Sequence, residues 1–140
     1  SDNAAFFVPE ATLGIIPDAG GVLRLPQRLP KAIAMDLLMT GRRMELDEAM
    51  HYGLVNRRTS LQNLKTHAIE WAHEVAQSAP LALASIKAVM RETENLKLED
   101  AYKLMRSDKI EVYQQMLRSE DAEEGPLAFS EKRVPEWKGR

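Results

Sequence analysis

The pattern of hydrophobic and polar positions over residues 1–29 predicts the least helical part of the chain. Phe6-Phe7-Val8 is a short apolar run that predicts a buried strand. Asp18-Ala19-Gly20-Gly21 is typical of a turn, and the apolar residues after it predict a short helix that begins at Val22. Pro26 and Pro30 then indicate a loop.

The pattern changes at Lys31. Residues 31–40 predict a helix, with Pro30 at its start and Gly41 directly after its end. A second short helix is predicted over 47–52, and residues 54–56 predict a short strand. No further strand is predicted after it.

Apolar positions recur at steps of three and four from residue 61 onward, which predicts amphipathic helices. The first follows an N-cap at Ser60, the second starts at Pro80, the third is one long helix over 98–116, and Ser119 caps the fourth. Gly125-Pro126 is expected to distort the middle of that fourth helix. The apolar stripe of the first helix consists of Leu61, Leu64, Ala68, Trp71 and Val75. One or two strands do not form a stable sheet alone, so we expect the chain to need partner strands that it does not contain.

Composition narrows the class of protein. The 140 residues correspond to one ordinary domain, and 44% apolar residues exclude global disorder. A net charge of −2 argues against a general nucleic-acid binder. The absence of cysteine excludes a disulfide scaffold, a thiolate nucleophile and a cysteine zinc site, and suits a cytoplasmic protein. No apolar run approaches the roughly 20 residues that cross a bilayer, so no membrane partner is expected.

Two carboxylates, Glu10 and Asp18, lie at positions where a catalytic or ligand-binding role can be considered. Glu10 follows Pro9 at the end of the apolar run, and strand ends are where α/β folds place their sites. A carboxylate there suits proton transfer, although the residues alone favour a solvated loop carboxylate. Asp18 lies beside Gly20-Gly21, and these glycines let a ligand approach the protein backbone closely. A turn residue that satisfies nearby amides is the default interpretation of Asp18, and no Gly-Lys-Ser/Thr follows to indicate a P-loop.

Other polar groups carry weaker signals. No histidine pair has a metal-binding spacing, so ordinary helix positions are favoured for His51, His67 and His73. Arg42-Arg43 and Arg57-Arg58 are interpreted as solvated basic pairs. Phe129 and Lys132 lie one helical turn apart and could stack on and neutralise a nucleotide-like ligand, although a helix end whose charges suit the helix dipole is the favoured interpretation.

Residues 5–21, Ala5-Phe6-Phe7-Val8-Pro9-Glu10-Ala11-Thr12-Leu13-Gly14-Ile15-Ile16-Pro17-Asp18-Ala19-Gly20-Gly21, resemble the central signature of the enoyl-CoA hydratase/isomerase (crotonase) superfamily. Further motifs follow in the order and spacing of that family: Arg24-Leu25-Pro26, Thr40-Gly41-Arg42, Glu48-Ala49, Gly53-Leu54-Val55-Asn56, Ala79-Pro80, Lys87 and the closing stretch 119–133. The resemblance covers essentially the whole chain. Residues 21–26, 39–44 and 135–140 narrow it to a dehydratase branch of the family.

The resemblance implies an α/β fold: the C-terminal half of a crotonase-like ββα spiral over 1–57, followed by a mainly α-helical trimerisation and CoA-contacting region over 58–140. It also implies that the first half of the fold, with the oxyanion-hole donors and one catalytic glutamate, precedes this chain. The expected partners are that first half, an acyl-CoA substrate, and other copies in a homotrimer or dimer of trimers.

The activity implied by the resemblance is the reversible dehydration of a short 3-hydroxyacyl-CoA. Two alternatives stay open: an enoyl-CoA or dienoyl-CoA isomerase that uses Glu10 together with Asp18, and a non-catalytic piece that only forms oligomer contacts. No metal or redox cofactor is expected, because coenzyme A belongs to the substrate. The implied catalytic residues are Glu10 and Asp18, and the implied substrate- or CoA-binding residues are Pro17, Gly20, Gly21, Phe129 and Lys132.

Overall fold

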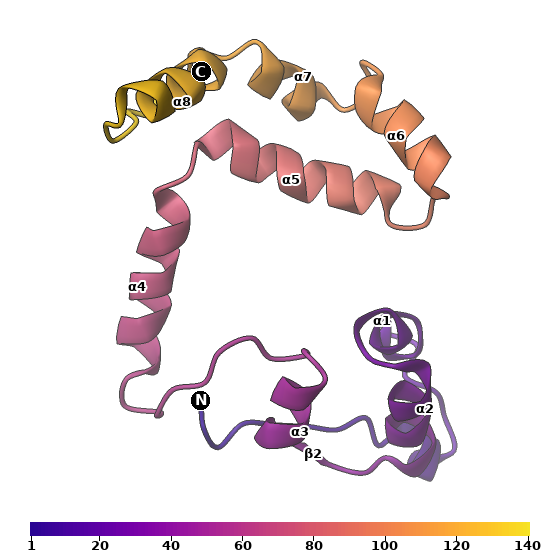
Figure 1. Cartoon of the computed structure of the whole chain (residues 1–140). Coiled ribbons are helices and arrows are strands. Elements are labelled where there is room, and N and C mark those ends of the chain that lie inside the picture. Colours follow the sequence, from indigo (N-terminus) through magenta and orange to yellow (C-terminus); the bar gives the residue numbers. More distant parts are fainter. The chain divides into compact units, whose positions relative to one another are not determined.

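The computed structural model describes all 140 residues. The chain forms two compact units, Ser1–Ile69 and Glu70–Arg140, and each is described by itself (Figure 1). The boundary lies inside helix α4, Leu64–Ala76, which is exposed along its whole length. The domain boundary predicted between residues 57 and 58 stays a prediction.

The first unit contains a two-stranded sheet and several short helices. The two strands pair antiparallel, with Ala5 opposite Glu45 and Phe6 opposite Met44. In chain order its elements before α4 are β1 Ala5–Phe6, the 3-10 helix η1 Glu10–Leu13, α1 Gly21–Arg28, α2 Lys31–Thr40, β2 Met44–Glu45 and α3 Leu46–His51.

The core of this unit lies where α2, β2 and α3 meet the end of α1. Its buried members are Leu29, Ala34, Leu37, Met44 and Ala49. Helix α2 has the predicted bounds because Gly41 ends it in a left-handed conformation, with φ +63°, and donates its N–H to the Leu37 carbonyl. Burial of one face of α2 thus fixes the loop that follows it.

Two strand predictions in this unit need correction. The strand predicted at 6–8 is displaced to Ala5–Phe6, and Phe6 and Phe7 are 38% and 59% exposed instead of buried. The strand predicted at 54–56 is wrong. The N–H groups of Leu54 and Val55 both donate to the Ala49 carbonyl, so this segment folds back on the end of α3 instead of meeting a strand.

The loop predicted from Pro26 is also wrong, because Pro26 lies inside α1. Proline has a helical φ and removes only one hydrogen bond from the helix. The helix therefore continues to Arg28, and buried Leu29 follows it, with its N–H donated to the Leu25 carbonyl.

The second unit is entirely helical apart from its loops and its C-terminal tail. Helix α5 packs along α7 and also contacts α6, and α7 contacts α8 (Figure 1). Buried Ser85 on α5 donates its hydroxyl to the Val112 carbonyl at 3.0 Å. The helices after α4 are α5 Pro80–Thr93, α6 Leu98–Arg106, α7 Glu111–Leu117 and α8 Glu120–Glu131.

The single long helix predicted over 98–116 is two helices, α6 and α7. Ser107 separates them, because its hydroxyl donates to the Leu104 carbonyl and accepts from the Lys109 N–H, and so competes with the helical backbone. The predicted start and N-cap of the fourth helix are confirmed: the Ser119 hydroxyl accepts from the Ala122 N–H at the start of α8. None of the helices is both long and apolar enough to cross a membrane.

Candidate active site

Glu10 opens the 3-10 helix η1, directly after Pro9. Its Oε2 atom is buried and has no hydrogen-bond partner. Because buried polar atoms are almost always paired, an unpaired one marks a place where a function or a missing partner explains the cost. A carboxylate oxygen shielded from water and free of hydrogen bonds is available to accept a proton from a bound molecule.

The turn that carries Glu10 is held by the backbone and by α2. Thr12 donates both its N–H and its hydroxyl to the Pro9 carbonyl, at 2.9 and 2.7 Å. On the other side, a Cβ built on Gly41 would lie 3.1 Å from the Pro9 Cα and 3.1 Å from the Thr12 Cγ2. The end of α2 therefore lies directly against the turn that presents Glu10.

Asp18 lies on the turn before α1, and its side chain is exposed without a hydrogen bond or ion pair. Pro17 beside it is buried. A Cβ on Gly21 would lie 2.8 Å from the Pro17 Cβ and 3.6 Å from a Val8 methyl group. The structure thus brings Pro17 and Gly21 together against the segment that leads to Glu10, and leaves the Asp18 carboxylate in solvent.

Arg42, interpreted from the sequence as a solvated residue, is the centre of an ion-pair cluster. Its Nε donates to Asp36 near the end of α2, and its two Nη atoms hold both oxygens of Glu48 on α3, at 2.8 and 2.6 Å. The hydrogen bonds that Arg42 donates lower the pKa of Glu48, and the acceptance of these bonds by Glu48 and Asp36 raises the pKa of Arg42. We call Asp36, Arg42 and Glu48 the Arg42 clamp.

Arg42 and Glu48 belong to two motifs of the family resemblance, but nothing in the sequence predicted that they pair. Both partners lie six residues from Arg42, which is neither of the spacings, three or four, that place side chains together on a helix. Arg58 is likewise paired, with Asp47, and Arg43 pairs with Glu45.

Phe129 and Lys132 belong to the second unit. The Phe129 ring is 87% exposed, and Lys132 ends α8 in a left-handed conformation, with φ +56°. Its N–H donates to the Phe129 carbonyl, so the two residues are joined by the turn that closes the helix. Both side chains therefore face solvent and are free to contact a ligand.

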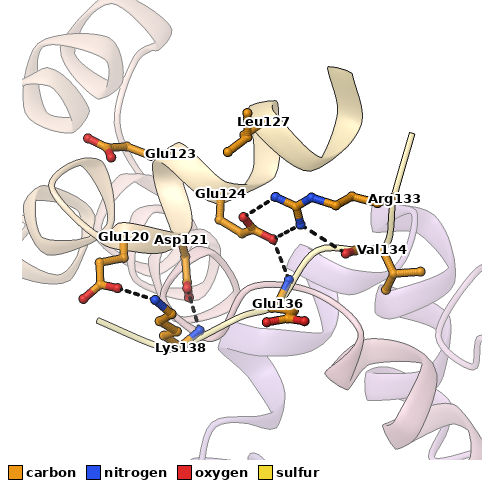
Figure 2. Close-up of a pocket in the computed structure, with 9 residues that line it drawn as sticks. All are labelled: Glu120, Asp121, Glu123, Glu124, Leu127, Arg133, Val134, Glu136 and Lys138. Carbon is orange, nitrogen blue, oxygen red and sulfur yellow. Dashed lines mark hydrogen bonds and ion pairs between the residues drawn. The ribbon is translucent and has the colours of Figure 1, made fainter. Parts of the chain in front are cut away.

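The C-terminal tail, residues 134–140, is bound to α8 by a row of carboxylates, and we call this arrangement the α8 strap (Figure 2). Asp121, 5% exposed, accepts from the N–H groups of Lys138 and Gly139 at 2.7 and 2.9 Å. Glu124 holds the Arg133 guanidinium through both oxygens and accepts from the Glu136 N–H. The acidic side chains in the first turns of α8 thus bind the tail.

The electrostatics of the strap follow from these pairs. Arg133 and the Glu136 N–H lower the pKa of Glu124 to about 2. Lys138 lowers the pKa of Glu120, which in turn raises the pKa of Lys138. Several of the charged side chains that line the open pocket along the strap, of about 460 Å³, are therefore already paired with one another. No group of three or more His, Asp or Glu side chains is arranged to hold a metal ion.

A family model described as enoyl-CoA hydratase/isomerase matches residues 1–140. The chain belongs to this family. Among curated relatives, the carnitinyl-CoA dehydratase of Proteus mirabilis (strain HI4320) is 58% identical over 140 residues, and that of Escherichia coli (strain K12) is 53% identical over the same length. These matches cover 100% of this chain and 54% of each relative. The chain thus spans about half the length of these relatives, in their C-terminal part.

Solved structures of the enoyl-CoA hydratase/isomerase family agree with the fold. The enoyl-CoA hydratase from Bacillus anthracis superimposes with a TM-score of 0.88 at 34% identity, covering 99% of this chain and 52% of that one. The enoyl-CoA hydratase from Mycobacterium tuberculosis H37Rv gives a TM-score of 0.86 at 32% identity, covering 99% and 54%. The predicted family and the predicted C-terminal half of a crotonase fold are confirmed. The roles of the individual site residues stay predictions.

Proposed function

We propose that the full-length protein that contains this chain catalyses the reversible dehydration of carnitinyl-CoA to crotonobetainyl-CoA. The proposal is supported by relatives named carnitinyl-CoA dehydratase at 53–58% identity over the whole chain. It is also supported by the buried and unpaired Oε2 atom of Glu10, which is the single structural observation that carries it.

The chemistry needs a base placed against a weakly acidic proton. In the dehydration direction the Glu10 carboxylate takes the proton from the carbon next to the thioester, and the electrons of that C–H bond form the double bond. The β-hydroxyl leaves as water after it takes a proton from a second acid. That acid and the donors to the developing thioester oxyanion would come from the half of the fold that this chain does not cover.

We further propose that Phe129 and Lys132 contact the nucleotide end of coenzyme A in a neighbouring subunit, within a trimer or a dimer of trimers. An exposed aromatic ring can stack on an adenine, and an ammonium group can pair with a phosphate. The Phe129 side chain is 87% exposed, so its ring is accessible for such stacking. Coenzyme A is part of the substrate, and the proposed reaction uses no separate cofactor.

Replacement of the proposed base tests the function. In the full-length protein, Glu10→Gln is expected to lower the hydration of crotonobetainyl-CoA and crotonyl-CoA by about 100-fold or more, because in this direction the carboxyl group has to give a proton to the α-carbon and the amide cannot do so. Loss of the enoyl-thioester absorbance measures the rate. Glu70→Gln is the matched control, because Glu70 is exposed on α4.

The outcomes separate the candidate functions. Glu10→Gln that retains the wild-type rate would contradict the assignment of the base. Migration of the double bond without water addition, lost in Asp18→Asn, would instead identify an isomerase. A full-length protein with neither activity would leave only the oligomer-forming role.

A further inference from the structure

We propose that Arg42 is a positioning residue for the reaction: the Arg42 clamp holds the loop after α2 against the turn that carries Glu10, and so sets where the Glu10 carboxylate lies. This inference rests on the proposed function, in which Glu10 is the base. It concerns a residue that does not itself reach the substrate.

The clamp joins α2 to α3 through the loop that follows α2. Arg42 lies between α2 and β2, and its guanidinium binds Asp36 on α2 and both oxygens of Glu48 on α3. The side chains of Arg42 and Glu48 are 33% and 30% exposed, so the pair is partly shielded from water. A bidentate pair of this kind fixes orientation as well as distance, which a lysine in the same place would not do.

The residue directly before Arg42 transmits this constraint. Gly41 lies close enough to η1 that an added Cβ would stand 3.1 Å from the Pro9 Cα and from the Thr12 Cγ2. Pro9 and Thr12 lie on either side of Glu10 in the turn that carries it, and the Thr12 N–H and hydroxyl both donate to the Pro9 carbonyl. Movement of Gly41 would therefore move the turn as one piece.

The side chain of Glu10 has no hydrogen bond or ion pair that anchors it. Its buried Oε2 has no hydrogen-bond partner, so its side chain is placed by its backbone and by packing. The position of a carboxylate held in this way changes whenever the backbone turn that carries it moves. Misplacement of a reacting group by about 1 Å can cost about 100-fold in rate.

The experiment compares turnover for each correctly formed site in the full-length protein. Sites are counted by the stoichiometry of binding of butyryl-CoA, a saturated thioester without a β-hydroxyl, so that a loss of folded protein does not alter the result. Arg42→Met is expected to lower kcat per binding site at least 10-fold, while the Kd for butyryl-CoA stays within about twofold. Arg42→Lys, which keeps the charge but not the fork, should give an intermediate kcat.

Two further variants keep the test decisive. Gly41→Ala acts on the other side of the same contact, and it should lower kcat per site in the same way if Arg42→Met does not fold. Arg43→Met is the matched control, because Arg43 is the neighbouring arginine, pairs only with Glu45, and is 60% exposed. It is expected to leave kcat per site unchanged.

The inference is overturned if Arg42→Met, or Gly41→Ala where Arg42→Met does not fold, has a kcat per binding site within twofold of the wild type. Glu10→Gln is measured beside these variants. Wild-type turnover in Glu10→Gln would refute the proposed function itself, whereas an inactive Glu10→Gln with an unaffected Arg42→Met refutes only the positioning role.

Discussion

At the scale of single residues, Gly21 shows how closely the turn before α1 is packed. A Cβ at this position would meet the Pro17 Cβ at 2.8 Å, a separation that real Cβ atoms essentially never show. Pro17 is buried, so it has little room to move away. The glycine is therefore required by the contact between the start of α1 and the segment before it.

Gly21→Ala is expected to destabilise the full-length protein by about 1–3 kcal/mol, which is typical of overpacking at a close contact. Unfolding in urea measures the change in the free energy of unfolding. Gln27→Ala, on the exposed side of the same helix, should stay within about 0.5 kcal/mol of the wild type. Equal stability of Gly21→Ala and the wild type would show that Pro17 moves aside at no cost.

The role proposed for Glu10 could be predicted from the sequence, whereas the contacts of Arg42 could not. Glu10 could be singled out because it follows an apolar run, and its motif identifies the family. The partners of Arg42 could not be predicted, because Asp36 and Glu48 meet it only after α2 and α3 pack on a common core. A spacing of six residues has no meaning until that packing exists.

At the scale of elements, helices with clear local end signals were predicted well. The helix that begins after Pro30 and the helix that begins at Pro80 start where predicted, and the Ser119 cap precedes α8 as expected. Helix α8 continues through Gly125-Pro126, where distortion was expected. Glycine before proline suffers the least steric conflict in a helix, because it has no Cβ.

Elements that depend on distant partners were predicted poorly. The apolar run at 54–56 reads as a strand by composition, but its N–H groups bind the end of α3. The strand β2 was missed, because two residues carry no periodic signal and its only evidence is the pairing with β1. The break between α6 and α7 depends on whether the Ser107 hydroxyl bonds the nearby backbone, as it does to the Leu104 carbonyl, or leaves the backbone to continue the helix.

The α8 strap predicts a dependence of stability on acid. The folded-state pKa of Glu124 is lowered to about 2, below its ordinary value of 4.5, so its pairing stabilises the strap fully above that ordinary value. This stabilisation is lost as the pH falls from about 4.5 towards 2. We expect the tail to leave α8 in that range.

Fluorescence of Trp137 measures this release, because its Nε1 donates to the Gln77 carbonyl when the tail is bound. Trp71→Phe removes the only other tryptophan of these 140 residues. In that background Glu124→Gln should show a weaker change between pH 4.5 and 2, since the titrating group is gone. The same acid transition in both proteins would assign the effect to another group, such as Glu120.

At the scale of the whole molecule, this chain has a very small sheet and an uncovered apolar surface. Its sheet has two strands of two residues each, and such a sheet is marginal by itself. Leu13, Ile15 and Ile16, which follow Glu10 closely, are 71%, 61% and 63% exposed. Exposed apolar side chains in such number indicate a surface that other protein covers.

We therefore expect the 140-residue chain, produced by itself, to show no hydration of crotonobetainyl-CoA. Glu10 alone does not stabilise the thioester oxyanion that forms when water adds to the β-carbon. The assay is the same loss of enoyl-thioester absorbance, with the full-length protein as the positive control. Turnover by the isolated chain would contradict the proposal that the oxyanion donors lie outside it.

The sequence by itself determined the family, the order of the helices and the identity of the carboxylate expected to act as the base. These depend on motifs and on interactions between residues three or four apart, which the chain carries locally. Only the tertiary structure decided the Arg42 clamp, the α8 strap and the shielding of the Glu10 Oε2 atom. Each of these depends on residues that lie more than one helical turn apart in the sequence. How closely such residues approach depends on how the helices pack, which no local pattern encodes.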